Sequence, residues 1–400
     1  MVLEDIFVLI IMTYGVSITF GYLLQKYLRM PWMFSSLFFG LALSAFGIFN
    51  SAIESDLFNL LQTLGMYLLL FIIGFSIDFK KMERLKNYVA FGTVAVISLE
   101  GLLGSLLLYF VFPAEVSNSF VIALIAALSF ATVGEAVLLP ILSEFKIIKT
   151  DFGQLTLGIG TLDDVVEVLM LAAVAVLPGF LSISQAQVFP NPEFVLLDLA
   201  GMLLLTFVVI KLGGEVKRML EKNHPPSYMF SLLTLLVFFC FIALGGFVAE
   251  SLATVGAIFG GISLRRLLPK ERLQENERAI EFLGYIFLSP FFFLSVGASV
   301  SFSAIFIYPL LIALIWLVAT IAKLLASYSL FHKLLGNKFS ILLGFGLSVR
   351  FSTGLIVQYV LLNSQLISSA LFSSLVATAI FMTPVIIIVY SWALSKQKPE

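Results

Sequence analysis

The chain has 400 residues, of which 60% are hydrophobic and only 12% charged, and its mean hydropathy is +1.08. A soluble domain is about 45–50% apolar, so this composition excludes an ordinary soluble protein and indicates a polytopic membrane protein. The formal net charge is −1, and no basic cluster with interleaved aromatic residues is present, which argues against a nucleic-acid partner.

Thirteen apolar segments, most of them about 17–25 residues long as a bilayer crossing requires, are separated by loops marked by charge, Pro, Asn and Gly. We therefore predict an all-α polytopic membrane protein with about 13 transmembrane helices. The ninth is short and rich in glycine. In chain order the spans are 4–24, 31–49, 57–77, 88–112, 120–142, 152–176, 194–212, 228–248, 252–264, 279–300, 304–331, 339–362 and 367–394.

The distribution of basic residues predicts the orientation of these spans. Of the 23 Lys and Arg residues, all but two lie in the C-terminal tail or in the connectors that follow odd-numbered spans, including the edges of these connectors. Cytoplasmic loops retain Lys and Arg during insertion, so we expect the N-terminus outside and the C-terminus inside, in the cell inner membrane. No cleavable signal is expected, because Lys26, Arg29 and another span directly follow the first apolar stretch.

No glycine-rich phosphate loop follows a predicted strand, so nucleotide hydrolysis is not the expected energy source. We expect a transporter and not an enzyme, with no cofactor. The single cysteine, Cys240, excludes an internal disulfide framework, and we expect it to be a small buried hydrophobic residue.

Seven ionisable residues lie deep inside predicted spans. At about 2.5–3.5 kcal/mol for each isolated charge, the set would cost on the order of 20 kcal/mol, so these groups are expected to face one another or a water-filled cavity. Five acids against two bases leave a deficit of positive charge, which bound protons or a bound cation must fill. The seven residues are Glu100, Glu135, Asp163, Asp164, Glu167, Lys323 and Arg350.

The stretch "TLDDVVEV" places three of these acids near the middle of the sixth span. Adjacent helix positions differ by about 100° of rotation, so Asp163 and Asp164 cannot both point at one partner. They can serve neighbouring roles, one in a salt bridge and one open to solvent. Glu167 shares the face of Asp163 at i+4. The alternative is that these acids only hold helices together. For Glu167 alone, this structural role and a functional role have equal weight.

Two spans carry clusters of small residues at membrane depth, "LSFATVGEAVLLP" and "GFGLSVRFSTGLI". Such segments can unwind and expose backbone carbonyls to an ion, although small residues also allow close helix packing. Each is the fifth span of a set of six, and the sets 1–6 and 8–13 have opposite orientation, which predicts an inverted-topology repeat. Glu135 and Arg350 lie in these segments, where they can compensate helix dipoles or pair with each other, or Arg350 can hold Glu167.

These residues resemble the monovalent cation:proton antiporter superfamily, in particular its two-aspartate, electrogenic branch that includes NhaA and NapA. The resemblance covers essentially the whole chain. It rests on "TLDDVVEV", "FATVGEA", "PFFFLSVGASVSF", "LVATIAKLLASY", "LSVRFSTG" and "LLLFIIGFSIDF". Glu135, Glu167 and the absence of an acid after the arginine in "RFSTG" depart from the family pattern.

The resemblance implies an NhaA-type fold with two crossing discontinuous helices, and it implies a homodimer. It implies that Asp164 binds the ion and the proton, that Asp163 is the partner of Lys323, and that Thr132 is accessory lining. It also implies dimerisation helices in 1–84 and 226–303, a transporting core in 85–178 and 304–396, and a connecting helix in 193–213.

We therefore expect an electrogenic Na⁺/H⁺ antiporter that serves pH homeostasis and works by alternating access, in which the cation and protons compete for Asp164, with Asp163 and Lys323 as partners. The alternatives are a K⁺/H⁺ antiporter of the Kef type, a sodium-coupled solute symporter, and a channel or receptor that uses the same charges. For Lys323 the alternative is a side chain that snorkels to the cytoplasmic interface, because His332 and Lys333 mark the exit of its span.

Overall fold

All secondary structure in the described part of the chain is helical, as predicted. The computed structural model describes residues 2–28, 30–76, 85–134, 138, 142, 147–148, 150–163, 166, 170, 192–223, 226–247, 252–350 and 353–395.

The helix boundaries follow the predicted spans closely for most of the chain. Residues 151–163 are also helical, and short π-helical turns extend α1 and precede α13. The α-helices are α1 (Val2–Leu23), α2 (Phe34–Phe46), α3 (Asn50–Ile53), α4 (Asp56–Ser76), α5 (Lys86–Val111), α6 (Phe120–Phe130), α9 (Pro192–Asn223), α10 (Ser227–Gly246), α11 (Leu252–Leu267), α12 (Lys270–Glu281), α13 (Ser289–Ala298), α14 (Phe302–Ile307), α15 (Pro309–Leu347), α16 (Thr353–Asn363) and α17 (Ser369–Ser395).

Within the described ranges, eight helices are long and apolar enough to cross a membrane, and three further apolar helices are shorter. A multi-pass protein follows, while the count of thirteen spans and their orientation stay predictions. The longest helix, α15, has 39 residues and contains a non-helical residue, Gly336, with φ of 74°. This kink lies between the predicted eleventh and twelfth spans.

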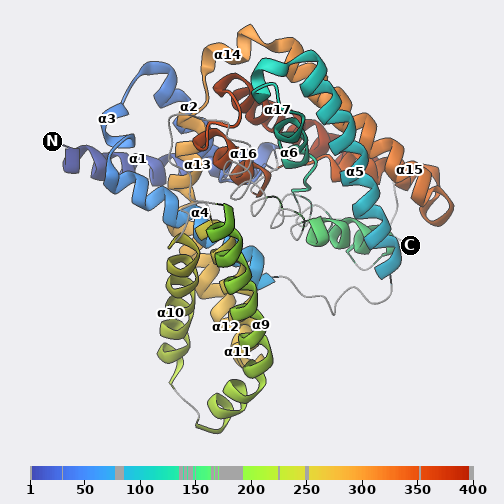
Figure 1. The fold of residues 1–400 in the computed structure, drawn as a ribbon. Helices are drawn as coiled ribbons and strands as arrows, with labels where there is room; N and C mark the ends of the chain where they lie inside the picture. The colour runs from blue at the N-terminus through green and yellow to red at the C-terminus, as the bar shows by residue number, and fades with distance from the viewer. Residues whose placement is uncertain are drawn as a thin grey trace. The chain divides into compact units, whose positions relative to one another are not determined.

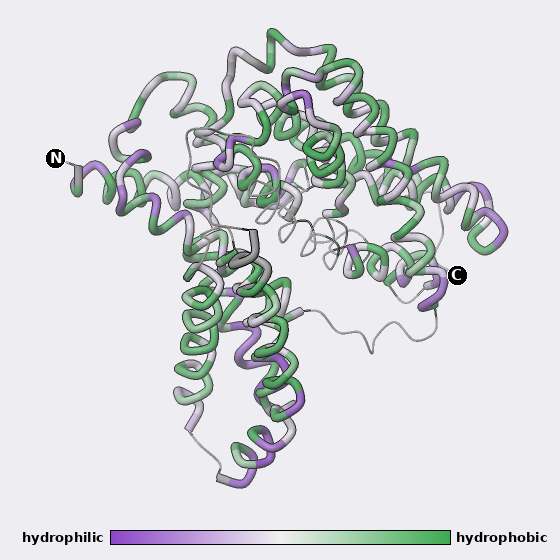
Figure 2. The backbone as a smooth tube through the Cα atoms, in the orientation of Figure 1, coloured by the Kyte–Doolittle hydropathy of each residue, from purple (hydrophilic) through white to green (hydrophobic). Residues whose placement is uncertain are grey.

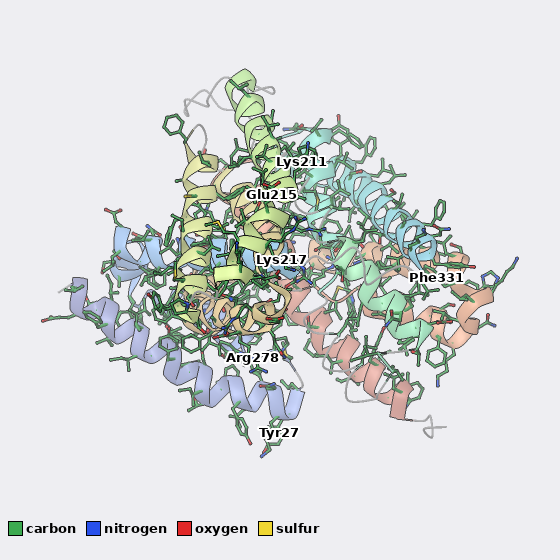
Figure 3. The ribbon with its side chains drawn as sticks, turned by 90° about the horizontal axis from the view of Figure 1, so that it is seen from below. Tyr27, Lys211, Glu215, Lys217, Arg278 and Phe331 are labelled. Atoms are coloured by element: carbon green, nitrogen blue, oxygen red, sulfur yellow. The ribbon has the colours of Figure 1, made fainter. Side chains whose placement is uncertain are left out.

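The chain forms two compact units, and the first contains residues Met1–Ile10, Ser51–Asp78 and Leu171–Phe293. In this unit α11 packs against α4, α9 and α10, and Figure 1 shows α9 beside α10. Glycine permits the α4 contact, because a Cβ at Gly74 would lie 2.0 Å from the carbonyl oxygen of Ile258. Among the charged residues of this unit in, or at the edge of, predicted cytoplasmic connectors, Figure 3 labels Lys211, Glu215 and Lys217 on α9 and Arg278 on α12.

Apolar side chains cover much of the outer surface of the first unit. Figure 2 shows α10 as hydrophobic along most of its length and the C-terminal end of α9 as hydrophilic. Leu236 and Phe239 on α10 are 61% and 52% exposed. Cys240 is exposed as well, so its predicted burial is wrong. The reason is that an apolar residue of a membrane helix can face lipid or a partner instead of a protein core.

The second unit contains residues Ile11–Asn50, Phe79–Met170 and Leu294–Glu400. In it α5 packs against α6 and α15, α15 packs against α17, and α16 packs against α6 and α17 (Figure 1). The loop before α6 is fastened to the loop before α17, because the Ser368 amide donates to the Glu115 carbonyl at 3.1 Å and the Ser368 hydroxyl donates to the Glu115 carboxylate. Of the seven ionisable residues that we predicted deep inside spans, all those that the structure describes lie in this unit.

Candidate cation and proton site

Two helices of the second unit are interrupted where the small-residue clusters predicted it. Helix α6 ends at Phe130, and residues 131–134 are not helical. Helix α15 ends at Leu347, and α16 begins at Thr353. The two interruptions meet, because the amide of Gly134 donates to the carbonyl oxygen of Val349 at 2.7 Å. Backbone carbonyls at membrane depth are thereby turned toward the side chains around them.

Lys323 on α15 is completely buried at this junction. Its Nζ donates to the carbonyl oxygen of Thr132 at 3.0 Å and to the carbonyl oxygen of Leu347. Both carbonyls lie at the C-terminal ends of helices, where the helix dipole carries partial negative charge. Lys323 thus holds both interrupted helices at their ends, and it does not snorkel to an interface.

Glu100 on α5 is the ion-pair partner of two buried bases. Its Oε1 accepts from Nη2 of Arg350 at 2.5 Å, and its Oε2 lies 3.3 Å from Nζ of Lys323. Arg350 also lies over the ring of Phe130, with its guanidinium carbon 4.9 Å from the ring centroid. We predicted Glu100 as a buried acid but gave it no partner, and the sequence signal was the need of two buried bases for nearby acids.

Asp163 is the last residue of the described helical stretch 151–163 and is 1% exposed. Its Oδ2 accepts from the amide of Val133 at 2.6 Å, so the carboxylate is fixed to the end of the α6 interruption. Its Oδ1 has no hydrogen-bond partner among the described residues. Asp163 interacts electrostatically with Lys323, but the ion pair of Lys323 is with Glu100 and not with Asp163 as the resemblance implied.

Side chains of α16 approach the same interruption from another direction. A Cβ at Gly354 would lie 2.5 Å from Oγ1 of Thr132 and 2.7 Å from the carbonyl oxygen of Ser129, so glycine is required for this approach. The carbonyl oxygen of Ser129 accepts from Oγ1 of Thr132 at 3.2 Å and from Nε2 of Gln358 at 3.4 Å. Sequence reasoning missed Gln358, although an amide inside an apolar span was visible in "TGLIVQYV".

Three predicted site residues, Asp164, Glu135 and Glu167, lie outside the described residues. Of the predicted set, the structure brings together Asp163, Thr132, Lys323 and Arg350, and it adds Glu100. In this part of the site two acids balance two bases. The open oxygen of Asp163 can bind a proton or a cation while Glu100 stays in contact with both bases.

Comparisons with known sequences and structures give the family of this chain. A family model described as "Sodium/hydrogen exchanger, transmembrane" matches residues 15–396. The chain belongs to this family. Among the relatives of this sodium/hydrogen exchanger family member is a Na⁺/H⁺ antiporter of Enterococcus hirae, 26% identical over 92% of this chain and 93% of the relative. A probable Na⁺/H⁺ antiporter 3 of Methanocaldococcus jannaschii is 26% identical over 91% of each chain.

A solved structure of the sodium proton antiporter MjNhaP1 from Methanocaldococcus jannaschii at pH 8 has a similar fold. It matches this family member with a TM-score of 0.66 over 99% of each chain, at 16% sequence identity. The family prediction is therefore confirmed at the level of the sodium/hydrogen exchangers. The narrower assignment to the NhaA and NapA branch stays a prediction, since the matching structure is of the NhaP1 type.

Proposed function

We propose that this protein is an electrogenic Na⁺/H⁺ antiporter of the cell inner membrane. The observation that carries the proposal is the buried carboxylate of Asp163, which is fixed at the junction of two interrupted helices with one oxygen unsatisfied among the described residues. Membership of the sodium/hydrogen exchanger family supports the same function. The protein is proposed to act as a homodimer, with residues 1–84 and 226–303 in dimerisation and 85–178 and 304–396 in transport.

Transport is proposed to follow from competition at one site. A buried carboxylate needs a proton or a cation as compensation, because an isolated charge is costly in a medium of low dielectric. In the inward-facing state a cation displaces the proton from Asp164 and Asp163, and in the outward-facing state protons displace the cation. Since only one of the two can occupy the site at a time, their gradients are coupled.

The charge moved per cycle is proposed to depend on Asp163 and Lys323. A cation bound beside Asp163 weakens the electrostatic support of the Lys323 ammonium, which can then release a second proton equivalent. Glu100 opposes this release, because its carboxylate remains 3.3 Å from Nζ of Lys323. Lys323→Ala is therefore expected to keep measurable exchange but to change the charge moved per cation.

Proteoliposomes with an imposed pH gradient test the assignment of the acids. Addition of Na⁺ should dissipate the gradient, and a membrane potential should change the rate because the exchange moves charge. Asp163→Asn and Asp164→Asn should each abolish the response, since an amide cannot exchange a proton. Asp56→Asn, an exposed residue at the start of α4, serves as the matched control and should behave as wild type. Unchanged exchange in both site variants would refute the assignment.

A panel of cations at fixed pH separates this proposal from the alternatives. Preference for K⁺ over Na⁺ would favour a K⁺/H⁺ antiporter. Sodium uptake that requires an organic solute and no pH gradient would favour a symporter. Flux that does not depend on a counter-gradient would favour a channel.

A further inference from the structure

Gln358 is a buried polar side chain beside the proposed site that the mechanism above does not use. It is 4% exposed and lies on α16 one helical turn after Gly354, so both residues share the helix face toward the end of α6. Its Nε2 donates to the carbonyl oxygen of Ser129 at 3.4 Å. A carbonyl can only accept, so the NH₂ group must occupy this position and the amide orientation follows.

The other end of this amide is unsatisfied. Oε1 of Gln358 has no hydrogen-bond partner among the described residues, and the same holds for Oδ1 of Asp163. Both are acceptors, and the two side chains are anchored on one short segment, Gln358 at Ser129 and Asp163 at Val133. Buried acceptors without donors are rare in folded proteins, and two such acceptors on one segment need a common explanation.

The surroundings of this segment favour a cation as that explanation. The segment, residues 129–133, contains the C-terminal end of α6, where backbone carbonyls carry partial negative charge. Carboxylate, amide and hydroxyl oxygens are hard ligands that suit hard cations. Oγ1 of Thr132 adds a hydroxyl oxygen, whose proton is used on the carbonyl of Ser129 and whose lone pairs remain. A water or a cation can satisfy acceptors of this kind, and the negative charge of Asp163 favours the cation.

We propose that Gln358 is a cation-binding residue, whose amide oxygen acts as a neutral ligand beside Asp163 and sets the preference among alkali cations. This inference rests on the proposed antiport function. An amide does not titrate, so Gln358 should influence affinity and ion choice through size and geometry without changing the number of protons exchanged. This separates its role from those of the aspartates and of Lys323.

The test replaces the amide by a side chain of similar length without oxygen. In proteoliposomes, Gln358→Met should raise KM for Na⁺ and Li⁺ about tenfold, the effect of one lost ligand worth about 1.4 kcal/mol. The rate at saturating cation and the charge moved per cation should stay as in wild type. Gln62→Met is the matched control, because Gln62 on α4 is also buried and its Nε2 donates to Asn59 at 2.7 Å. This control should leave KM unchanged.

Cation-induced thermal stabilisation of the purified protein gives a second measurement that does not require transport. Added Na⁺ should raise the unfolding temperature of wild type and Gln62→Met, and this rise should be smaller in Gln358→Met. Gln358→Asn keeps the amide on a shorter side chain, and its rise in unfolding temperature should lie between those of wild type and Gln358→Met. It replaces Gln358→Met as the test if that variant folds poorly. Equal KM values and equal Na⁺ stabilisation in wild type and the Gln358 variants would overturn the inference. A wild-type protein without cation-dependent exchange would instead overturn the proposed function.

Discussion

At the scale of single residues, the notable feature is one acid shared by two bases. Glu100 is fully buried, and its two oxygens face Lys323 and Arg350. Removing one member of a buried ion pair leaves an uncompensated charge and typically costs about 3–5 kcal/mol. Because both bases pair with Glu100, Asp163 forms no ion pair with either of them. Its carboxylate is therefore available to bind a proton or a cation.

We expect Glu100→Gln to destabilise the protein by about 3–5 kcal/mol, because both Lys323 and Arg350 lose their counter-charge. Exchange should also fall strongly, since Lys323 would then turn to Asp163. Thermal unfolding in detergent and proteoliposome exchange measure the two effects. Glu271→Gln, at an exposed position at the start of α12, is the control and should change neither.

The double variant Glu100→Gln with Arg350→Gln removes one acid and one base together. Because charge balance is restored, it should be more stable than Glu100→Gln alone, and the double-mutant cycle gives the coupling energy. Strictly additive losses would contradict the direct pair that the 2.5 Å contact indicates.

At the scale of secondary-structure elements, the site depends on two helices that end inside predicted membrane spans. It also depends on the hydrogen bonds that hold these helix ends together. The amide of Gly134 bonds to Val349, and Lys323 bonds to the carbonyls of Thr132 and Leu347. These bonds satisfy backbone groups that a continuous helix would satisfy internally. The close approach of α16 to α6 at Gly354 completes this arrangement.

Gly354→Ala should therefore weaken both folding and exchange. The new Cβ would lie 2.5 Å from Oγ1 of Thr132 and 2.7 Å from a backbone oxygen, which forces α16 away from α6. Overpacking of this kind typically costs about 1–3 kcal/mol. Unfolding temperature and initial exchange rate are the measurements.

Gly201→Ala on α9 is the matched control, since a Cβ there meets nothing within 4 Å. Alanine favours a helix over glycine by up to about 1 kcal/mol, so this control should be neutral or slightly stabilising. Opposite signs for the two substitutions are expected. A Gly354→Ala protein as stable and active as wild type would argue against a tight contact between α6 and α16.

At the scale of the whole molecule, the few basic residues of an apolar chain predict its orientation in the membrane. Nearly all Lys and Arg residues lie in alternate connectors, and the described helices include eight that can cross a membrane. The opposite orientations of the two predicted sets of six helices follow only if the number of spans between them is odd. A measured topology therefore tests the repeat as well.

Cysteine accessibility in intact cells measures that topology. In a Cys240→Ala background, a membrane-impermeant maleimide added outside should label Ser51→Cys, in the connector after the second span. It should not label Asn337→Cys, in the connector after the eleventh, until the membrane is permeabilised. Both positions are exposed, so burial does not explain a difference. The reverse pattern would invert the predicted orientation.

Much of this architecture was predictable because hydrophobicity and charge act locally. Apolar runs longer than a bilayer is thick must span it, and small residues in "LSFATVGEA" and "GFGLSVRFS" marked both interruptions. Burial of Lys323 and Arg350 followed from their depth inside spans. Cys240 was mispredicted because an apolar helix does not reveal in its sequence whether a face meets protein or lipid.

The sequence by itself determined that this protein is an integral membrane protein and that its buried charges must compensate one another. Only the tertiary structure decided which acid serves which base. Arg350 pairs with a carboxylate 250 residues away, and Lys323 bonds to a carbonyl 191 residues away. Ion pairs inside a membrane protein are chosen by the packing of helices far apart in the chain, and no local pattern contains that choice.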